Sequence, residues 1–175
     1  MRKLIVTLVP LLLSCAGAQA KDEFAKLRCD ADIPKALIGQ REANDPVVKT
    51  EAKYKSLGLK HLGADIVADD MNTISWRICG KEFMVLDKRS TIADVVEFPP
   101  HSRTSPPFSG ACRIKGSETR DIIVAVLDDA SGKGDLLPAK AAWRIDQKAG
   151  KLVKMETSDL LCPRSGVYYP TDEGK

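Results

Sequence analysis

The cysteines constrain the fold of this chain more than any other feature of its sequence. Of the five, Cys15 lies near the N-terminus, and Cys29, Cys79, Cys112 and Cys162 follow at separations of 50, 33 and 50 residues. In a chain that is exported, an even number of remaining cysteines predicts a framework of two disulfides. Three pairings are possible, and the spacing does not choose among them. Zinc binding is disfavoured, because no two of the four are close enough to form the usual ligand pair.

The first 20 residues have the three parts of a secretory signal peptide. Arg2 and Lys3 supply a positive start, residues 4–13 form an apolar run, and Ala18 and Ala20 mark a cleavage site. The apolar run is shorter than the roughly 20 residues that span a bilayer. We therefore expect cleavage after residue 20 and release into the periplasm or outside the cell. The mature chain, residues 21–175, is expected to form one disulfide-stapled domain with no transmembrane helix.

A second processing route is also compatible with this segment. Residues 12–15 resemble the site at which bacterial lipoproteins are cleaved and acylated on a cysteine. The small Ser14 fits that pattern, whereas Leu13 is bulkier than the pattern usually carries. On this alternative the protein is an envelope lipoprotein anchored through Cys15, although a single acyl chain holds a protein only weakly on a membrane.

Removal of the first 20 residues changes the apparent charge of the protein. The full chain carries 27 basic and 24 acidic residues, a net charge of +3. Arg2 and Lys3 are the only charged residues of the signal segment, so 25 basic and 24 acidic residues remain, a net charge of +1. A chain so close to neutrality gives no electrostatic reason to expect a nucleic-acid partner.

Short apolar and alternating segments dominate the chain after residue 70. A helix is predicted where Asp45 and Pro46 precede residues 47–56, and residues 57–67 fit either a strand or a loose turn. Six strands are predicted, at residues 74–78, 83–86, 92–98, 121–127, 141–145 and 152–155. Their short connections favour antiparallel pairing. We expect an α+β fold, mainly an antiparallel β-sheet of about six strands with one short N-terminal helix; a small β-sandwich or barrel is the alternative.

Residues 99–110 form a long predicted connection that contains four of the ten prolines. Proline rings stiffen the backbone and reduce the entropy that a loop loses when it binds a partner. We expect His101, Arg103 and Phe108 to be exposed there, and cationic and aromatic side chains are enriched at protein interfaces. The segment is interpreted either as a partner-binding loop or as a stiff crossover tied down by Cys112.

No pattern of residues points to catalysis, to a metal or to a cofactor. His61 and His101 are the two histidines, and no nucleophile motif accompanies them. Acidic pairs at residues 69–70 and 128–129 are typical of solvated turns, and residues 129–135 place a lysine where calcium would need an oxygen ligand. We therefore expect no catalytic residues, no bound metal and no cofactor.

These observations favour a small exported binding module without enzymatic activity. We expect an inhibitor or accessory of another protein, bound in the cell envelope or outside the cell through the loop at residues 99–110. The alternatives are a small exported hydrolase without a recognisable motif and the lipoprotein anchored through Cys15. A hydrolase with a cysteine nucleophile would need a reduced thiol, which is unusual in an oxidising compartment.

The intact mass of the exported protein tests the processing and the disulfides together. We expect a chain that begins at Lys21 and carries no lipid, because the signal segment is removed whole. Alkylation should modify the four remaining cysteines only after reduction, since disulfides do not react. An acylated Cys15 at the mature N-terminus would contradict cleavage after residue 20. Alkylation without reductant would contradict the disulfides.

Overall fold

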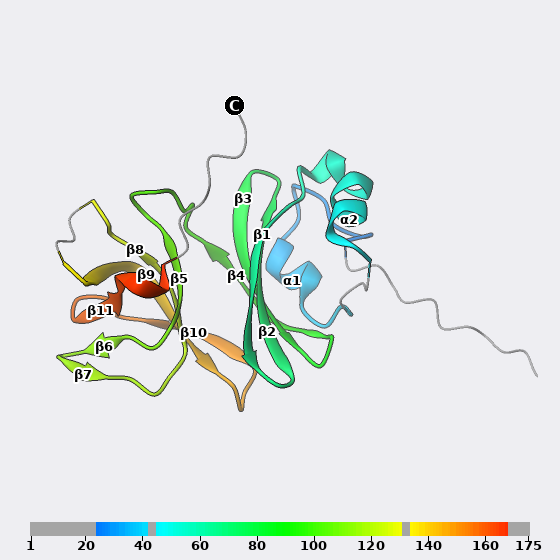
Figure 1. The fold of residues 1–175 in the computed structure, drawn as a ribbon. Helices are drawn as coiled ribbons and strands as arrows, with labels where there is room; N and C mark the ends of the chain where they lie inside the picture. The colour runs from blue at the N-terminus through cyan, green and yellow to red at the C-terminus, as the bar shows by residue number, and fades with distance from the viewer. Residues whose placement is uncertain (1–23, 42–44, 131–133, 168–175) are drawn as a thin grey trace, which may run out of the picture.

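A computed structural model describes residues 24–41, 45–130 and 134–167 of the chain. The expected signal peptide, residues 1–20, lies outside these described residues, and so does Cys15. Two antiparallel sheets lie next to each other, and the helices lie on the side of the first sheet that faces away from the second (Figure 1). Within the described ranges, every helix is too short to traverse a lipid bilayer.

Three short helical segments lie near the start of the described chain. α1 (Ile33–Leu37) is capped by Asp32, whose carboxylate accepts a hydrogen bond from the backbone N–H of Lys35 at 3.1 Å. The predicted helix is present as α2 (Val47–Lys53), and the single 3-10 turn η1 (Lys55–Leu57) follows it. The sequence pattern did not predict α1, because five residues are too few to show a helical period.

The first sheet is a meander of four antiparallel strands in which each strand pairs with the next. Its strands are β1 (Lys60–Ala68), β2 (Met71–Ile78), β3 (Lys81–Lys88) and β4 (Ile92–Phe98). Three of them contain predicted strands, and the ambiguous segment at residues 57–67 contributes most of β1. In this order β1 and β4 form the two edges of the sheet.

The second sheet contains the remaining strands and is organised around β9. Its elements are β5 (Pro107–Gly110), β6 (Arg113–Ile114), β7 (Ser117–Glu118), β8 (Ile123–Leu127), β9 (Leu136–Asp146), β10 (Lys151–Met155) and β11 (Leu160–Pro163), and the 3-10 turn η2 (Arg164–Gly166) follows. The order is β5-β8-β9-β11-β6-β7, and β10 pairs with the second half of β9. In this order β5 forms one edge of the sheet, as β1 does in the first.

Three apolar layers hold the helices and sheets together. The first lies between the helices and the first sheet and includes Phe24 and Trp76. The second lies between the two sheets and includes Met84 and Trp143. The third lies on the other face of the second sheet and includes Leu137. The expected α+β fold, built mainly of antiparallel strands, is confirmed, and both sheets remain open rather than closing into a barrel.

Two disulfides are present, as predicted, and the structure shows which of the three pairings is formed. Cys29 pairs with Cys79 and ties the segment before α1 to the turn after β2, with a Cα–Cα distance of 5.4 Å. Cys112 pairs with Cys162 and ties the connection after β5 to β11, with a Cα–Cα distance of 4.3 Å. Each disulfide therefore braces one of the two sheets, and neither joins one sheet to the other.

Removal of either disulfide should lower the free energy of unfolding by about 3–4 kcal/mol, because the cross-link limits the entropy of the unfolded chain. The variants are Cys29→Ala with Cys79→Ala, and Cys112→Ala with Cys162→Ala, measured by urea unfolding. Each variant serves as the control for the other, since both disulfides close separations of 50 residues. Losses that differ by more than about 2 kcal/mol would show that native packing, and not loop length, sets the effect.

Candidate functional site

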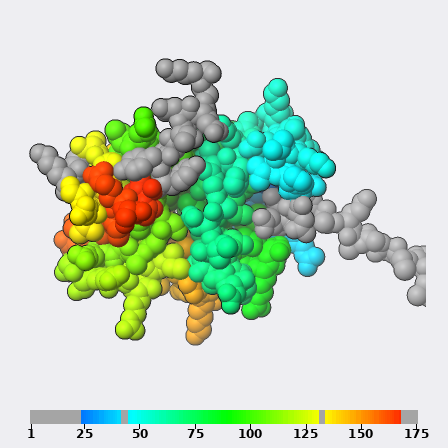
Figure 2. All heavy atoms as spheres, in the orientation of Figure 1, coloured from blue at the N-terminus to red at the C-terminus, as the bar shows by residue number. Residues whose placement is uncertain are grey.

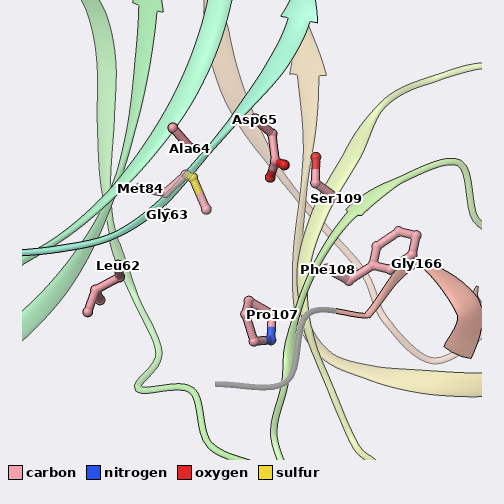
Figure 3. Close-up of a pocket in the computed structure, with 9 residues that line it drawn as sticks. All are labelled: Leu62, Gly63, Ala64, Asp65, Met84, Pro107, Phe108, Ser109 and Gly166. Atoms are coloured by element: carbon pink, nitrogen blue, oxygen red, sulfur yellow. The ribbon is translucent and has the colours of Figure 1, made fainter. Parts of the chain in front are cut away.

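A cleft of about 290 Å³ lies where the edge strand β1 of the first sheet approaches the edge strand β5 of the second. Its lining comes from β1, β3, β5 and η2, and comprises Leu62, Gly63, Ala64, Asp65, Met84, Pro107, Phe108, Ser109 and Gly166 (Figure 3). The residues of β1 and β5 that line the cleft are more than 40 positions apart in the chain. The packing of the two sheets is therefore what creates this site.

The inner part of the cleft is apolar and tightly packed. Met84 and Phe108 line it and are only 6% and 5% exposed. The ring of Phe108 lies directly against Gly166, where an added Cβ would come within 2.7 Å of the ring carbon Cε2. A glycine at this position is therefore required for the ring to keep its place in the cleft.

The wall formed by β1 is held in place at its first residues. The backbone N–H of His61 donates a hydrogen bond to the carboxylate of Glu51 on α2 at 2.8 Å. The ring of His61 packs edge-on against Trp76, with the ring centroids 5.0 Å apart. Burial lowers the pKa of His61, although the negative charge of Glu51 opposes that shift, so the folded structure favours the neutral imidazole.

Irregular pairing shapes β1 beyond His61. A bulge separates His61 from Gly63, and Gly63 has a φ of +153°, which residues with a side chain rarely adopt. A second bulge lies between Ile66 and Ala68. Between these bulges, residues 63–66 pair regularly with β2 and form a short regular edge beside the cleft.

The two strands that flank the cleft differ in how open their outer edges are. β5 begins at Pro107, which has no N–H to donate, and Phe108 also forms a bridge with Val167 on its outer side. On β1, Ala64 and Asp65 are exposed, and Ile66 is 85% exposed. Figure 2 shows β1 at the surface on the viewed face. β1 therefore offers the more accessible edge for hydrogen bonding to another chain.

The polar groups of the cleft gather at one rim. The side chains of Asp65 and Ser109 point toward one another from opposite walls (Figure 3). Among the residues that the structure describes, no basic side chain lies within ion-pair distance of Asp65. The arrangement combines an apolar interior with a carboxylate and a hydroxyl at its mouth.

The predicted loop is shorter than expected, and its three candidate residues do not share one surface. β5 occupies residues 107–110, and pairing with β8 turns Phe108 into the third apolar layer, so its expected exposure is wrong. His101 has an 11% exposed side chain that faces Glu82, whereas Arg103 is exposed. Of the three, only Phe108 lines the cleft. Partner binding through His101 and Arg103 stays a prediction.

Glu82 explains why His101 is withdrawn from solvent. It is 4% exposed and accepts hydrogen bonds from Nη2 of Arg77 at 2.8 Å and from the backbone N–H of His101 at 3.1 Å. Its Oε2 also lies 2.6 Å from Nδ1 of His101. Burial raises the pKa of Glu82, but these donors outweigh burial and hold the pKa below its ordinary value of 4.5. The contacts fix the start of the crossover from β4 to β5.

A second buried carboxylate, Asp87, lies apart from the cleft near the end of β3. Oδ1 accepts a hydrogen bond from the backbone N–H of Ser90 at 3.1 Å, and Oδ2 has no hydrogen-bond partner among the described residues. Burial raises the pKa of Asp87, and the hydrogen bond from Ser90 opposes that shift. The charge on this carboxylate therefore opposes folding at neutral pH, unlike the charge on Glu82.

The sequence pattern missed the residues of β1 that line the cleft. The available signal was the alternation of Leu62, Ala64 and Ile66, with Asp65 between the last two, but Gly63 interrupts it and favours a turn. Met84 was predicted to be part of a strand, and its place in a cleft depends on the packing of the second sheet.

Cysteine and metal chemistry also bear on what the described residues can do. Cys29, Cys79, Cys112 and Cys162 are all joined in disulfides, so none carries a free thiol. In the described ranges, no three histidine, cysteine or acidic side chains gather as metal ligands would.

Comparisons with protein-family models, with curated proteins and with solved structures found no match to this chain.

Glu82→Gln should destabilise the protein by about 2 kcal/mol at pH 7, because the buried carboxylate that accepts hydrogen bonds from Arg77 and His101 becomes a neutral amide. The pKa of Glu82 is lowered by folding, so its contribution to stability is present above its ordinary value of 4.5 and is lost as the pH falls through the lowered pKa. The difference between wild type and variant should therefore shrink below about pH 4.5, measured by urea unfolding at several pH values.

Glu97→Gln is the matched control for this measurement. Glu97 pairs with Lys81 at 3.0 Å, but the two side chains are 56% and 60% exposed. An exposed pair of this kind contributes at most about 1 kcal/mol, so the control should change stability little at any pH. Equal losses in the two variants would contradict a special role for the Glu82 contacts.

Proposed function

We propose that this protein is an exported binding module, without enzymatic activity, that takes up an extended segment of a partner protein in the cleft between β1 and β5. It would act as an inhibitor or accessory of another protein in the cell envelope or outside the cell. The observation that carries the proposal is an accessible strand edge on β1 directly beside an apolar cleft. Extended peptides bind proteins in this way, with backbone hydrogen bonds for affinity and pockets for specificity.

The two disulfides support this function because they make the site rigid before a partner arrives. The disulfide Cys29–Cys79 braces the sheet that carries β1. In the disulfide Cys112–Cys162, Cys112 lies two residues after the end of β5. A site that is already ordered loses less entropy on binding. Disulfides are also compatible with export, and an acyl group on Cys15 would tether the same module to a membrane without altering the cleft.

The rival hypothesis of a hydrolase is less well supported by the arrangement of side chains. Its version with a cysteine nucleophile needs a reduced thiol, and the four described cysteines are paired. The carboxylate–histidine pair of Glu82 and His101 is committed to the crossover between the sheets. The cleft itself presents Asp65 and Ser109, a pair suited to hydrogen bonding with a ligand.

A photo-crosslinking amino acid at position 64 tests the proposed function. Ala64 is exposed on the edge strand β1 beside the cleft, so a crosslinker there should attach to a chain that pairs with this edge. We expect one discrete crosslinked partner in extracts of the compartment into which the protein is exported, detected by gel mobility and mass spectrometry. An excess of unlabelled wild-type protein should compete it away.

The matched control places the same crosslinker at Lys154, which is exposed on β10 away from the cleft. This variant should give no discrete product. The same products from both positions, or none from position 64 in any extract, would contradict binding in the cleft.

A further inference from the structure

We infer that the bound segment pairs with β1 as an added strand and carries a lysine or arginine with an apolar residue on each side. This inference rests on the proposed function and specifies its ligand. It follows from three features of β1: a regular edge at residues 63–66, the carboxylate of Asp65, and the exposed apolar side chain of Ile66.

The edge of β1 determines the backbone of the ligand. Residues 63–66 pair regularly with β2, and successive residues of such an edge strand direct their N–H and C=O groups alternately toward and away from the neighbour. The outward groups can bond to an extended chain. β5 is a poorer template, because Pro107 lacks an N–H and Val167 already bridges to Phe108.

The two faces of β1 determine the alternation of side chains in the ligand. Asp65 pairs with Thr73 and lies on the face that meets the cleft, whereas Ala64 and Ile66 pair with Ile74 and Asn72 and lie on the opposite face. Side chains on an added strand lie beside those of β1 on the same face. A ligand residue next to Asp65 is therefore flanked in sequence by residues that lie beside Ala64 and Ile66.

The chemistry of these neighbours specifies the ligand residues. Asp65 has no basic partner among the described residues, so a cationic head group next to it would form an ion pair, and the hydroxyl of Ser109 could accept a further hydrogen bond. The apolar interior of the 290 Å³ cleft suits the methylene stem of lysine or arginine. On the other face, Ile66 is 85% exposed and would be covered by apolar neighbours.

A second copy of this chain fits the edge less well. Two copies of β1 paired antiparallel about Asp65 would place two carboxylates opposite each other, which is unfavourable across a strand pair. A partner with the opposite charge has no such penalty. The ligand is therefore expected to be a different protein.

The test uses nine-residue peptides of alternating threonine and valine, with one central residue flanked by valines. The central residue is lysine, norleucine or glutamate, and a fourth peptide keeps lysine but replaces the flanking valines with serine. Binding to the oxidised wild-type protein is followed by NMR through the backbone amides of Ala64 and Ile66. We expect the lysine peptide to bind about fivefold more tightly than norleucine and at least about tenfold more tightly than glutamate at low salt.

Substitutions in the protein test whether the charge of Asp65 is what sets the preference for the lysine peptide. Asp65→Asn should abolish the preference for lysine, and Asp65→Lys should reverse it in favour of glutamate. Asp69→Asn removes the same charge from the exposed turn after β1 and should leave the preference unchanged. Ile66→Ser should weaken binding of the valine-flanked peptides about fivefold, whereas Val48→Ser, at a 76% exposed position on α2, should not.

Results that differ from these expectations would overturn the inference. Equal affinity for the lysine and glutamate peptides, or a preference unaffected by Asp65→Asn, would remove the role of charge. A dimer of the wild-type protein that Ile66→Ser converts to a monomer would assign the edge to a second copy. Failure of every peptide to bind, while a crosslinker at position 64 still captures a partner, would overturn this ligand and leave the proposed function standing; loss of both would overturn both.

Discussion

The apolar layer between the two sheets is the interaction on which the rest of the structure depends. β3 is buried along most of its length because its side chains are apolar on both faces. Phe83 and Val85 pack beneath the helices, and Met84 and Leu86 pack against the second sheet. A strand with two apolar faces must be covered on both, so the helices and the second sheet are each required. The cleft lies at one edge of the apolar layer between the sheets, where Met84 contributes to both.

Polar contacts at the margins of that layer fix how the two sheets are set against each other. At one end, Asp94 on β4 accepts a hydrogen bond from the backbone N–H of Leu152 at 2.9 Å, and Lys88 donates one to the carbonyl of Gln147 at 2.8 Å. The crossover from β4 to β5 is held by Glu82. Because neither disulfide spans the two sheets, the distance between β1 and β5, and hence the width of the cleft, depends on these contacts and on the apolar layer.

The strands that the sequence pattern predicted are those whose side chains alternate or form apolar runs, and these are β2, β3, β4, β8, β9 and β10. β6 and β7 have two residues each and carry no period. Phe108 was expected to be exposed because Pro106 and Pro107 are typical of loops, yet proline is tolerated as the first residue of an edge strand. The cleft could not be predicted, since its walls meet only through tertiary packing.

An accessible strand edge exposes a protein to unwanted pairing, and many edges are blocked by proline, bulges or charged side chains. β5 is blocked by Pro107. β1 has bulges at both ends but keeps a regular run between them, and it exposes Ile66 beside an apolar cleft. Asp65, in the middle of that run, disfavours pairing between two copies because their carboxylates would meet. The same carboxylate favours a cationic segment, so one side chain both limits self-association and leaves the edge open to a partner of opposite charge.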